Sequence, residues 1–265
     1  TLFSREQLFQ AYLDVEAALA RAQAKQNIIP EAAAHTISQM AQISNLNMDN
    51  INQSLDKTGH PLVPLIWELD RVCGDDAGGY IHWGATTQNI TQTGKLLVVK
   101  KCHDFYLKGL GELLFTLSDL AEKSKSYPMP GRTHGQHAVP ATFGYKVAVW
   151  IDELIRHVSR LKECEGRVFV AMLGGGAGTM ASVGLEGIET QNLMAKELGL
   201  ASMSMPSRTI GDHLTEYITL LAMLAATSSK MAREVYTMMK QEFGEVEEPV
   251  PLGAVGSSTM PHKIN

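Results

Sequence analysis

The sequence predicts an all-α fold, an elongated bundle of long helices, and two observations support this prediction. First, three stretches of roughly 30 residues each are predicted to be helical, one from a helical spacing of its apolar residues and two from residues that favour a helix start, and each corresponds to about 45 Å of helix. Second, no alternation of apolar and polar residues persists long enough to indicate a sheet. Helices of this length must bury their apolar faces against one another, so a bundle is expected.

The composition is that of a globular protein with a sizeable core. The chain has 265 residues, of which 45% are hydrophobic and 19% are charged, unlike a disordered sequence. A net charge of −5 offers no basic surface for nucleic acid, and no signal-peptide pattern or membrane-spanning apolar run is found. Three widely separated cysteines form no C-x-x-C pair, which favours reduced thiols in a cytoplasmic protein. Nothing implies a metal or organic cofactor.

Residues 1–90 are predicted to form an N-terminal helical domain. Its first helix is expected over residues 4–27, because apolar residues recur at spacings of three and four. Ser4 and Gln7 form a capping box at its start, and Pro30 lies just beyond its end. After it, the sequence indicates a short helix from Glu31 and a polar, Asn-rich segment over residues 45–53.

Residues 91–265 are predicted to form a central domain of long helices. The first long helix is expected over residues 91–126, where eight apolar side chains hold a helical period. Its two glycines weaken it slightly. Pro128 and Pro130 then stop it, because proline cannot continue a helix interior.

Two further long helices are expected in this domain. Pro140 can occupy the first turn of one that runs toward Met172, and Asp212 can open another that continues to about Glu242. The glycine-rich run at residues 174–178 lies between them. It lacks both a preceding strand and the Lys-Ser/Thr of a phosphate-binding loop, so a flexible connector or a close backbone approach is the favoured interpretation.

Three connectors combine glycine with groups that can do chemistry. The first covers residues 82–89 and is preceded by His60, within Gly-His-Pro. Thr86 and Thr87, followed by an amide and a helix start, form a cluster of neutral donors that could hold a carboxylate. The alternative, that Thr87 or Asn89 only caps the next helix, is equally consistent with the sequence.

The second connector covers residues 131–138, between the first two long helices. His134 and His137 could be a metal pair, but no acidic companions lie nearby. Imidazole titrates near neutral pH, so general acid or base work by one histidine is favoured over metal binding. The crowding of Arg132, Thr133, His134 and Gln136 in one turn strengthens this interpretation.

The third connector covers residues 256–265. Two glycines, at 253 and 256, give the backbone freedom to move, and the hydroxyl groups, Lys263 and Asn265 are donors for developing negative charge. Serine is a poor base unless backbone amides, a dipole or a cation stabilise its alkoxide. Taken alone, this segment would be interpreted as a solvated Ser/Thr loop.

Together the three connectors resemble the signature regions of the fumarase/aspartase superfamily. Residues 256–265, GSSTMPHKIN, match the pattern G-S-S-x-M-P-x-K-x-N at every fixed position, and the similarity extends over essentially the whole chain. The branch that holds adenylosuccinate lyase and 3-carboxy-cis,cis-muconate cycloisomerase is the most similar. Members of the superfamily continue past this loop, so the resemblance implies that a C-terminal domain is absent from residues 1–265.

The resemblance implies a homotetramer in which each active site combines the three regions from three subunits. Ser257 would be the base that removes a proton beside a substrate carboxylate, and Lys263 and Asn265 would bind the resulting charge. His134 would be the general acid, with His60 as its helper. The expected substrate-binding residues are Thr86, Thr87, Thr133, Gln136, Ser258, Met260 and Asn265.

The resemblance favours a lyase that eliminates an amine from an N-succinyl substrate and releases fumarate by anti elimination. Retention of His134 and His60 supports elimination, since a departing nitrogen must be protonated. Residues 206–213 keep only Asp212 of the Gln-Arg-Asp-Arg pattern of adenylosuccinate lyases. A cycloisomerase acting on carboxymuconate and an epimerase acting on an aspartate adduct therefore stay open. A catalytically silent helical assembly protein is the alternative from another class.

Overall fold

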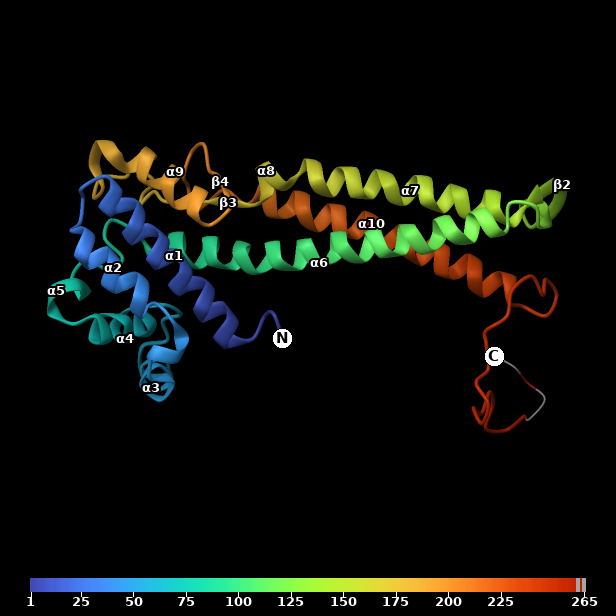
Figure 1. Cartoon of the computed structure of the whole chain (residues 1–265), viewed down its shortest axis with the longest axis horizontal. Coiled ribbons are helices and arrows are strands. Elements are labelled where there is room, and N and C mark those ends of the chain that lie inside the picture. The colour runs from blue at the N-terminus through green and yellow to red at the C-terminus, as the bar shows by residue number, and fades with distance from the viewer. Residues whose placement is uncertain (261–262, 264–265) are drawn as a thin grey trace. The chain divides into compact units, whose positions relative to one another are not determined.

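The computed structural model describes residues 1–260 and 263, and these residues are mostly helical (Figure 1). They divide into two compact units. Unit 1 comprises Thr1–Glu112 and Ser159–Tyr217, and unit 2 comprises Leu113–Val158 and Ile218–Asn265. The boundaries between the units fall within three long helices, α6 (Thr87–Lys123), α7 (Phe143–Glu163) and α10 (Asp212–Met238).

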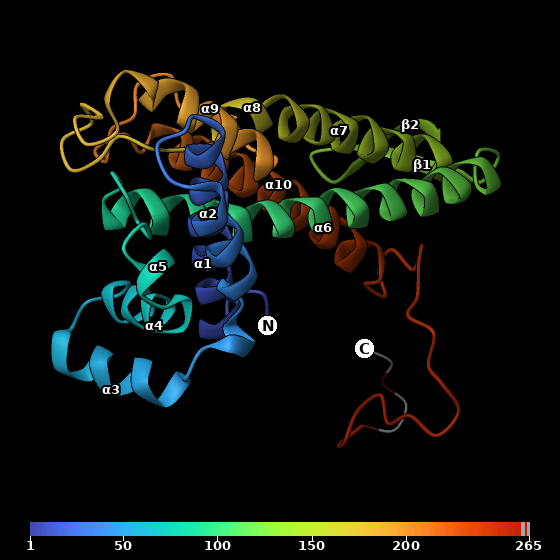
Figure 2. The same cartoon turned by 60° about the vertical axis from the view of Figure 1, so that its left-hand side comes forward.

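The core of unit 1 is organised around α1 (Arg5–Lys25). Ser4 caps this helix, since its Oγ accepts the Gln7 backbone N–H at 3.3 Å, which confirms the predicted helix start. α1 packs against α2 (Glu31–Met40) and α9 (Gly187–Glu197), as Figure 2 shows for α2. Because α1 is covered on more than one side, most of its residues are buried, including Leu13, Val15 and Leu19.

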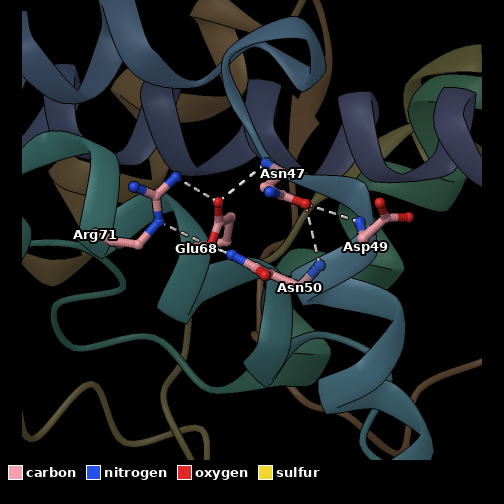
Figure 3. A network of polar contacts seen from close by, with 5 residues as sticks. All are labelled: Asn47, Asp49, Asn50, Glu68 and Arg71. Atoms are coloured by element: carbon pink, nitrogen blue, oxygen red, sulfur yellow. Dashed lines mark hydrogen bonds and ion pairs between the residues drawn. The ribbon is translucent and has the colours of Figure 1, made fainter.

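The Asn-rich segment of unit 1 is largely helical. Asn47 opens α3 (Met48–Thr58) by accepting the backbone N–H groups of Asp49 and Asn50. Glu68 of α4 (Val63–Cys73) in turn accepts the Asn47 N–H at 2.9 Å and pairs with Arg71 (Figure 3). The hydrogen bond from Arg71 holds the pKa of Glu68 below its ordinary value. The remaining short elements of this region are η1 (Ile43–Asn45) and α5 (Asp75–Gly78).

The three long helices were predicted correctly, but the predicted continuation of the second one toward Met172 is wrong. α7 ends at Glu163, and the chain then enters α8 (Glu165–Val168) and strand β3 (Val170–Ala171). β3 pairs in parallel with β4 (Ala201–Ser202). The backbone groups of this buried segment are satisfied across the strands, since Ala201 N–H donates to the Phe169 carbonyl at 2.9 Å.

The mostly helical fold confirms the predicted all-α class, but two short strands that no sequence pattern indicated, β1 (Pro128–Thr133) and β2 (Gln136–Thr142), form an antiparallel hairpin. Pro140 pairs with Pro130 across the strands instead of opening α7. Both strands of a two-stranded ribbon are edges, so proline is tolerated there. Most residues of β2 are exposed, so no buried face imposes the apolar alternation that sequence analysis would detect.

Gly144 lies in the first turn of α7, just after this hairpin, at a position with no room for a side chain. A Cβ at residue 144 would lie 2.5 Å from the Ala121 carbonyl oxygen and 2.6 Å from the Lys125 Cα, both backbone atoms of the preceding helical region. We expect Gly144→Ala to destabilise the protein by about 1–3 kcal/mol, because backbone atoms cannot rotate away. Urea unfolding measures this, with Gly166→Ala, at an open position of α8, as the control. Equal stability of the two variants would contradict the expected overlap.

The glycine-rich run at residues 174–178 is a close backbone approach, one of the two interpretations favoured by the sequence. A Cβ at Gly178 would lie 2.6 Å from the Pro206 carbonyl oxygen, and one at Gly174 would lie 3.1 Å from it. The short helix η2 (Gly184–Glu186) follows before α9. Within the described part of the chain, no helix has the length and apolar character needed to cross a membrane.

Candidate active site

The second predicted segment lies at the tip of the β1–β2 hairpin in unit 2. His134 and Gly135 are the two turn residues, with φ values of 51° and 76°, and Thr133 pairs with Gln136 at the end of the ladder. Two consecutive positive φ angles suit the right-handed twist of a hairpin. The hairpin thus presents the side chains of Thr133, His134 and Gln136 together at its exposed tip.

The third predicted segment begins with a hydroxyl that is already hydrogen-bonded to the backbone. Ser257 Oγ accepts the backbone N–H of Met260 at 3.1 Å and that of Thr259 at 3.4 Å. Such donors stabilise an alkoxide and thereby favour ionisation of the serine. Ser258, Met260 and Lys263 are exposed, and the Lys263 backbone N–H donates to the Met260 carbonyl at 3.0 Å. Asn265 lies outside the described residues.

A residue pair that sequence reasoning missed ties the hairpin to the chain that leads into this segment. Arg132 of β1 donates to Glu245 at 2.6 Å, with the two side chains only 18% and 15% exposed. The Arg132 guanidinium also lies over the Phe243 ring, 4.8 Å from its centroid. The hydrogen bond that Arg132 donates to Glu245 raises the pKa of Arg132. Glu245 lies close to other glutamates in the sequence, and no sequence pattern singles it out as the partner of Arg132.

A cavity of about 520 Å³ lies between this hairpin and the unit 2 portions of α7 and α10. Its three cations are each paired with a glutamate: Arg132 with Glu245, Lys146 with Glu234, and Lys230 with Glu153. Among the described lining residues, no cation is therefore left unpaired to bind a dicarboxylate. The cavity alone does not form the predicted site.

His60 lies in unit 1, where it caps a helix. Its Nδ1 accepts the backbone N–H groups of Leu62 at 3.3 Å and Val63 at 3.1 Å, at the start of α4. A ring nitrogen that accepts two hydrogen bonds carries no proton, so the proton of the neutral ring is assigned to Nε2. Nε2 is the atom through which His60 can exchange a proton with another group.

Thr86 and Thr87 also lie in unit 1, at the start of α6. Buried Asn89 holds this start, because its Oδ1 accepts the Thr86 backbone N–H at 3.0 Å and the Gly175 N–H at 3.1 Å. Asn89 therefore caps α6, which was the structural alternative to carboxylate binding that the sequence left open for this residue. It also links the predicted carboxylate cradle, Thr86 and Thr87, to the glycine-rich run.

A second pair missed by sequence reasoning lies immediately before this cradle. The Glu16 carboxylate of α1 contacts His82 Nδ1 at 2.6 Å and accepts the His82 backbone N–H at 3.2 Å. Burial lowers the pKa of His82, but the hydrogen bond and the charge of Glu16 outweigh this effect and raise the pKa above its ordinary value of 6.5. The sequence gives no signal for this pair, since its members are 66 residues apart.

A pH titration should detect the Glu16–His82 pair. We expect the His82 ring to titrate above pH 6.5 in NMR spectra, and Glu16→Gln to move the midpoint below 6.5, because burial still lowers the pKa while the charge of Glu16, and with it the charge-assisted hydrogen bond, is removed. With a raised folded-state pKa, the pair stabilises the folded protein fully below the unfolded pKa. This contribution is lost as pH rises through the folded-state pKa. A parent midpoint at or below 6.5 would contradict the pairing.

Comparisons with known proteins match the whole chain. The lyase family model covers residues 1–265. The chain is 38% identical over 264 residues to an N-acetyl-S-(2-succino)cysteine lyase of Dickeya dadantii and 39% identical over 266 residues to an adenylosuccinate lyase of Methanocaldococcus jannaschii. Each alignment covers 100% of this chain but 58% of the relative, so the chain spans less than two thirds of these proteins.

A solved structure shows the same fold. The crystal structure of a 3-carboxy-cis,cis-muconate lactonizing enzyme from Pseudomonas putida matches with a TM-score of 0.88 at 35% identity, covering 100% of this chain and 59% of that one. The predicted long helices, the order of the three segments and these matches agree with one another. The chain belongs to the lyase family of the fumarase/aspartase superfamily.

Proposed function

We propose that the full-length protein is a lyase that removes an amine from an N-succinyl substrate, an aspartate adduct, and releases fumarate by anti elimination. The observation that supports this most directly is the pair of backbone N–H groups, from Met260 and Thr259, that point at Ser257 Oγ. These donors compensate the negative charge that Ser257 must carry to act as a base.

The proposed reaction begins when Ser257 Oγ takes a proton from the methylene carbon beside one substrate carboxylate. The electron pair spreads into that carboxylate as an aci-carboxylate, which Lys263 and Asn265 stabilise by charge and hydrogen bonding. The pair then forms the C=C bond of fumarate while the C–N bond breaks. The departing nitrogen takes a proton from His134, so the products are fumarate and a neutral amine.

The other predicted residues take supporting roles in this proposal. His60 exchanges its Nε2 proton with the general acid, since Nδ1 is occupied by the α4 backbone. The carboxylate cradle holds one end of the substrate through hydroxyl and backbone donors. Four further residues contact the substrate from the other two segments: Thr133, Gln136, Ser258 and Met260.

We further propose that a homotetramer assembles each site from three subunits. The neutralised cavity of unit 2 supports this proposal, because its lysines and arginine are already paired and the charges that bind a dicarboxylate must come from other groups. Size-exclusion chromatography with light scattering on the full-length protein tests it. Mixing two inactive variants, one altered at Ser257 and one at His134, should restore part of the activity if subunits share sites.

The leaving atom has a second candidate, a thioether sulfur. One relative at 38% identity is named for a 2-succinocysteine substrate, in which sulfur replaces the nitrogen. The same proton removal beside a carboxylate would then expel a thiolate. Because a thiolate leaves at lower basicity than an amine nitrogen, this substrate depends less on a general acid.

A substrate panel distinguishes these reactions. The full-length protein is incubated with adenylosuccinate, simpler N-substituted aspartates, N-acetyl-S-(2-succino)cysteine and 3-carboxy-cis,cis-muconate, and fumarate is followed by its absorbance. Fumarate from a nitrogen adduct supports the proposal, and fumarate only from the sulfur adduct supports the second candidate. Loss of 3-carboxy-cis,cis-muconate without release of fumarate would indicate a cycloisomerase. Racemisation of an aspartate adduct would indicate an epimerase. No product from any substrate would refute lyase function.

A further inference from the structure

Helix α1 places two buried polar side chains against the connector that leads to the carboxylate cradle. Glu16 is 1% exposed and contacts His82 through both carboxylate oxygens, one at the ring and one at the backbone N–H. Gln23, two turns further along α1, is fully buried and donates from Nε2 to the Trp83 carbonyl at 2.7 Å. A buried carboxylate is costly unless its partners satisfy it, and here each oxygen has one.

The connector has a backbone conformation that needs such support. His82 and Gly84 both have positive φ, at 60° and 73°, and a non-glycine residue rarely adopts this region. On its other side the connector touches Val183, whose side chain would overlap any Cβ added to Gly84. The connector is therefore held between α1, which contacts His82 and Trp83, and the segment before α9, which lies against Gly84.

The anchored residue is directly coupled to the cradle. The His82 carbonyl accepts the Ala85 N–H at 3.2 Å, which closes a turn, and Thr86 is the next residue. Asn89 fixes the far side of Thr86 through the Thr86 N–H. The segment between His82 and Asn89 is thus pinned at both ends, and its α1 end depends on Glu16.

We propose that Glu16 is a positioning residue for substrate binding: by orienting His82 it holds the turn that sets Thr86 and Thr87 for a substrate carboxylate. The inference rests on the proposed lyase function. Glu16 takes no part in proton transfer in this proposal. Its loss is therefore expected to weaken substrate binding, measured as KM, more than turnover at saturation, measured as kcat. Glu16 and Gln23 lie on α1, far in sequence from all three signature segments.

Glu16→Gln tests this with a matched control. In the variant a neutral amide faces His82, and one of its two atoms is a donor, so His82 Nδ1 can keep a hydrogen bond only as an acceptor and the charge-assisted pair is lost. Glu68→Gln removes another buried carboxylate, 5% exposed, that also accepts a backbone N–H and pairs with a cation, but its partners belong to α3 and α4. Both variants lose comparable contacts, and only one of them touches the connector.

The kinetic arm compares KM with kcat in the full-length protein. Loss of a charge-assisted hydrogen bond weakens an interaction by about ten- to hundredfold, so we expect Glu16→Gln to raise KM by about tenfold or more with a smaller change in kcat. Glu68→Gln should lower thermal stability without a comparable rise in KM. An unchanged KM in Glu16→Gln, or an equal rise in Glu68→Gln, would overturn the proposal.

Amide hydrogen exchange separates this inference from the proposed function. We expect Glu16→Gln to speed exchange at the amides of residues 82–86, and Glu68→Gln to speed it at residues 47–50 instead. If the parent protein turns over no succinyl substrate, lyase function fails, while faster exchange confined to 82–86 still establishes that Glu16 holds the connector. Unchanged exchange at 82–86 would refute the positioning role whatever the activity.

Discussion

Replacing Ser257 with alanine is expected to lower kcat of the full-length protein by about a thousandfold or more, with a much smaller change in KM. The variant keeps the Met260 and Thr259 N–H groups but removes the oxygen that they stabilise, so no base remains at that position. Loss of a positioned base typically lowers the rate by about 100- to 10,000-fold. In the proposed reaction every turnover begins with proton removal by this base.

Thr259→Ala is the control for this loss. It alters a neighbouring hydroxyl residue in the same loop, at a variable position of the signature, and keeps the backbone N–H that donates to Ser257. We expect it to retain most of the parent kcat. If Ser257→Ala kept more than about a tenth of parent activity, Ser257 would not be the base, and the proposed mechanism would need another proton acceptor.

Replacing Phe169 with alanine is expected to have the largest effect on stability, a loss of about 3–5 kcal/mol in the free energy of unfolding. Phe169 is 1% exposed, and its ring centroid lies 4.9 Å from that of His103 and 5.5 Å from that of Tyr217. All three belong to unit 1, where burial raises the pKa of Tyr217 to about 12. Truncation would leave a cavity that these rings cannot fill without leaving their own contacts.

Chemical denaturation measures this loss, with Leu185→Ala as the control. Leu185 is 98% exposed, so removing its side chain should change the free energy of unfolding by less than about 0.5 kcal/mol. A loss below about 1 kcal/mol for Phe169→Ala would show that the site repacks. That outcome would contradict close packing of Phe169, which lies between α8 and β3, against His103 of α6 and Tyr217 of α10.

Much of the helical fold could be predicted because its signals are local. The cap at Ser4 and the helix start at Asp212 lie where the sequence indicates them, since capping depends on residues within one turn. The β1–β2 hairpin was missed for a physical reason as well. Most residues of β2 are exposed and most of β1 are only half-buried, so no buried face imposes an apolar alternation, and the prolines and glycines of the hairpin resemble an ordinary connector between helices.

The candidate site was predictable in its parts. Residues 256–265 carry a motif whose fixed positions all fall within ten consecutive residues, so the resemblance to the superfamily identifies Ser257 and its charge-binding partners as candidates. Whether these residues act as proposed stays a prediction. The leaving group of the substrate is not indicated, because residues 206–213 depart from the pattern of nucleotide-binding relatives.

The sequence by itself determined the family, the long helices and the candidate chemistry, because periodicity, caps and a contiguous motif are written in neighbouring residues. Only the tertiary structure decided which side chains support the candidate site. Glu16 meets His82 across 66 residues, and Arg132 meets Glu245 across 113. Such pairs form when packed helices bring distant segments together, and a buried charge is stable only where that packing supplies its partner.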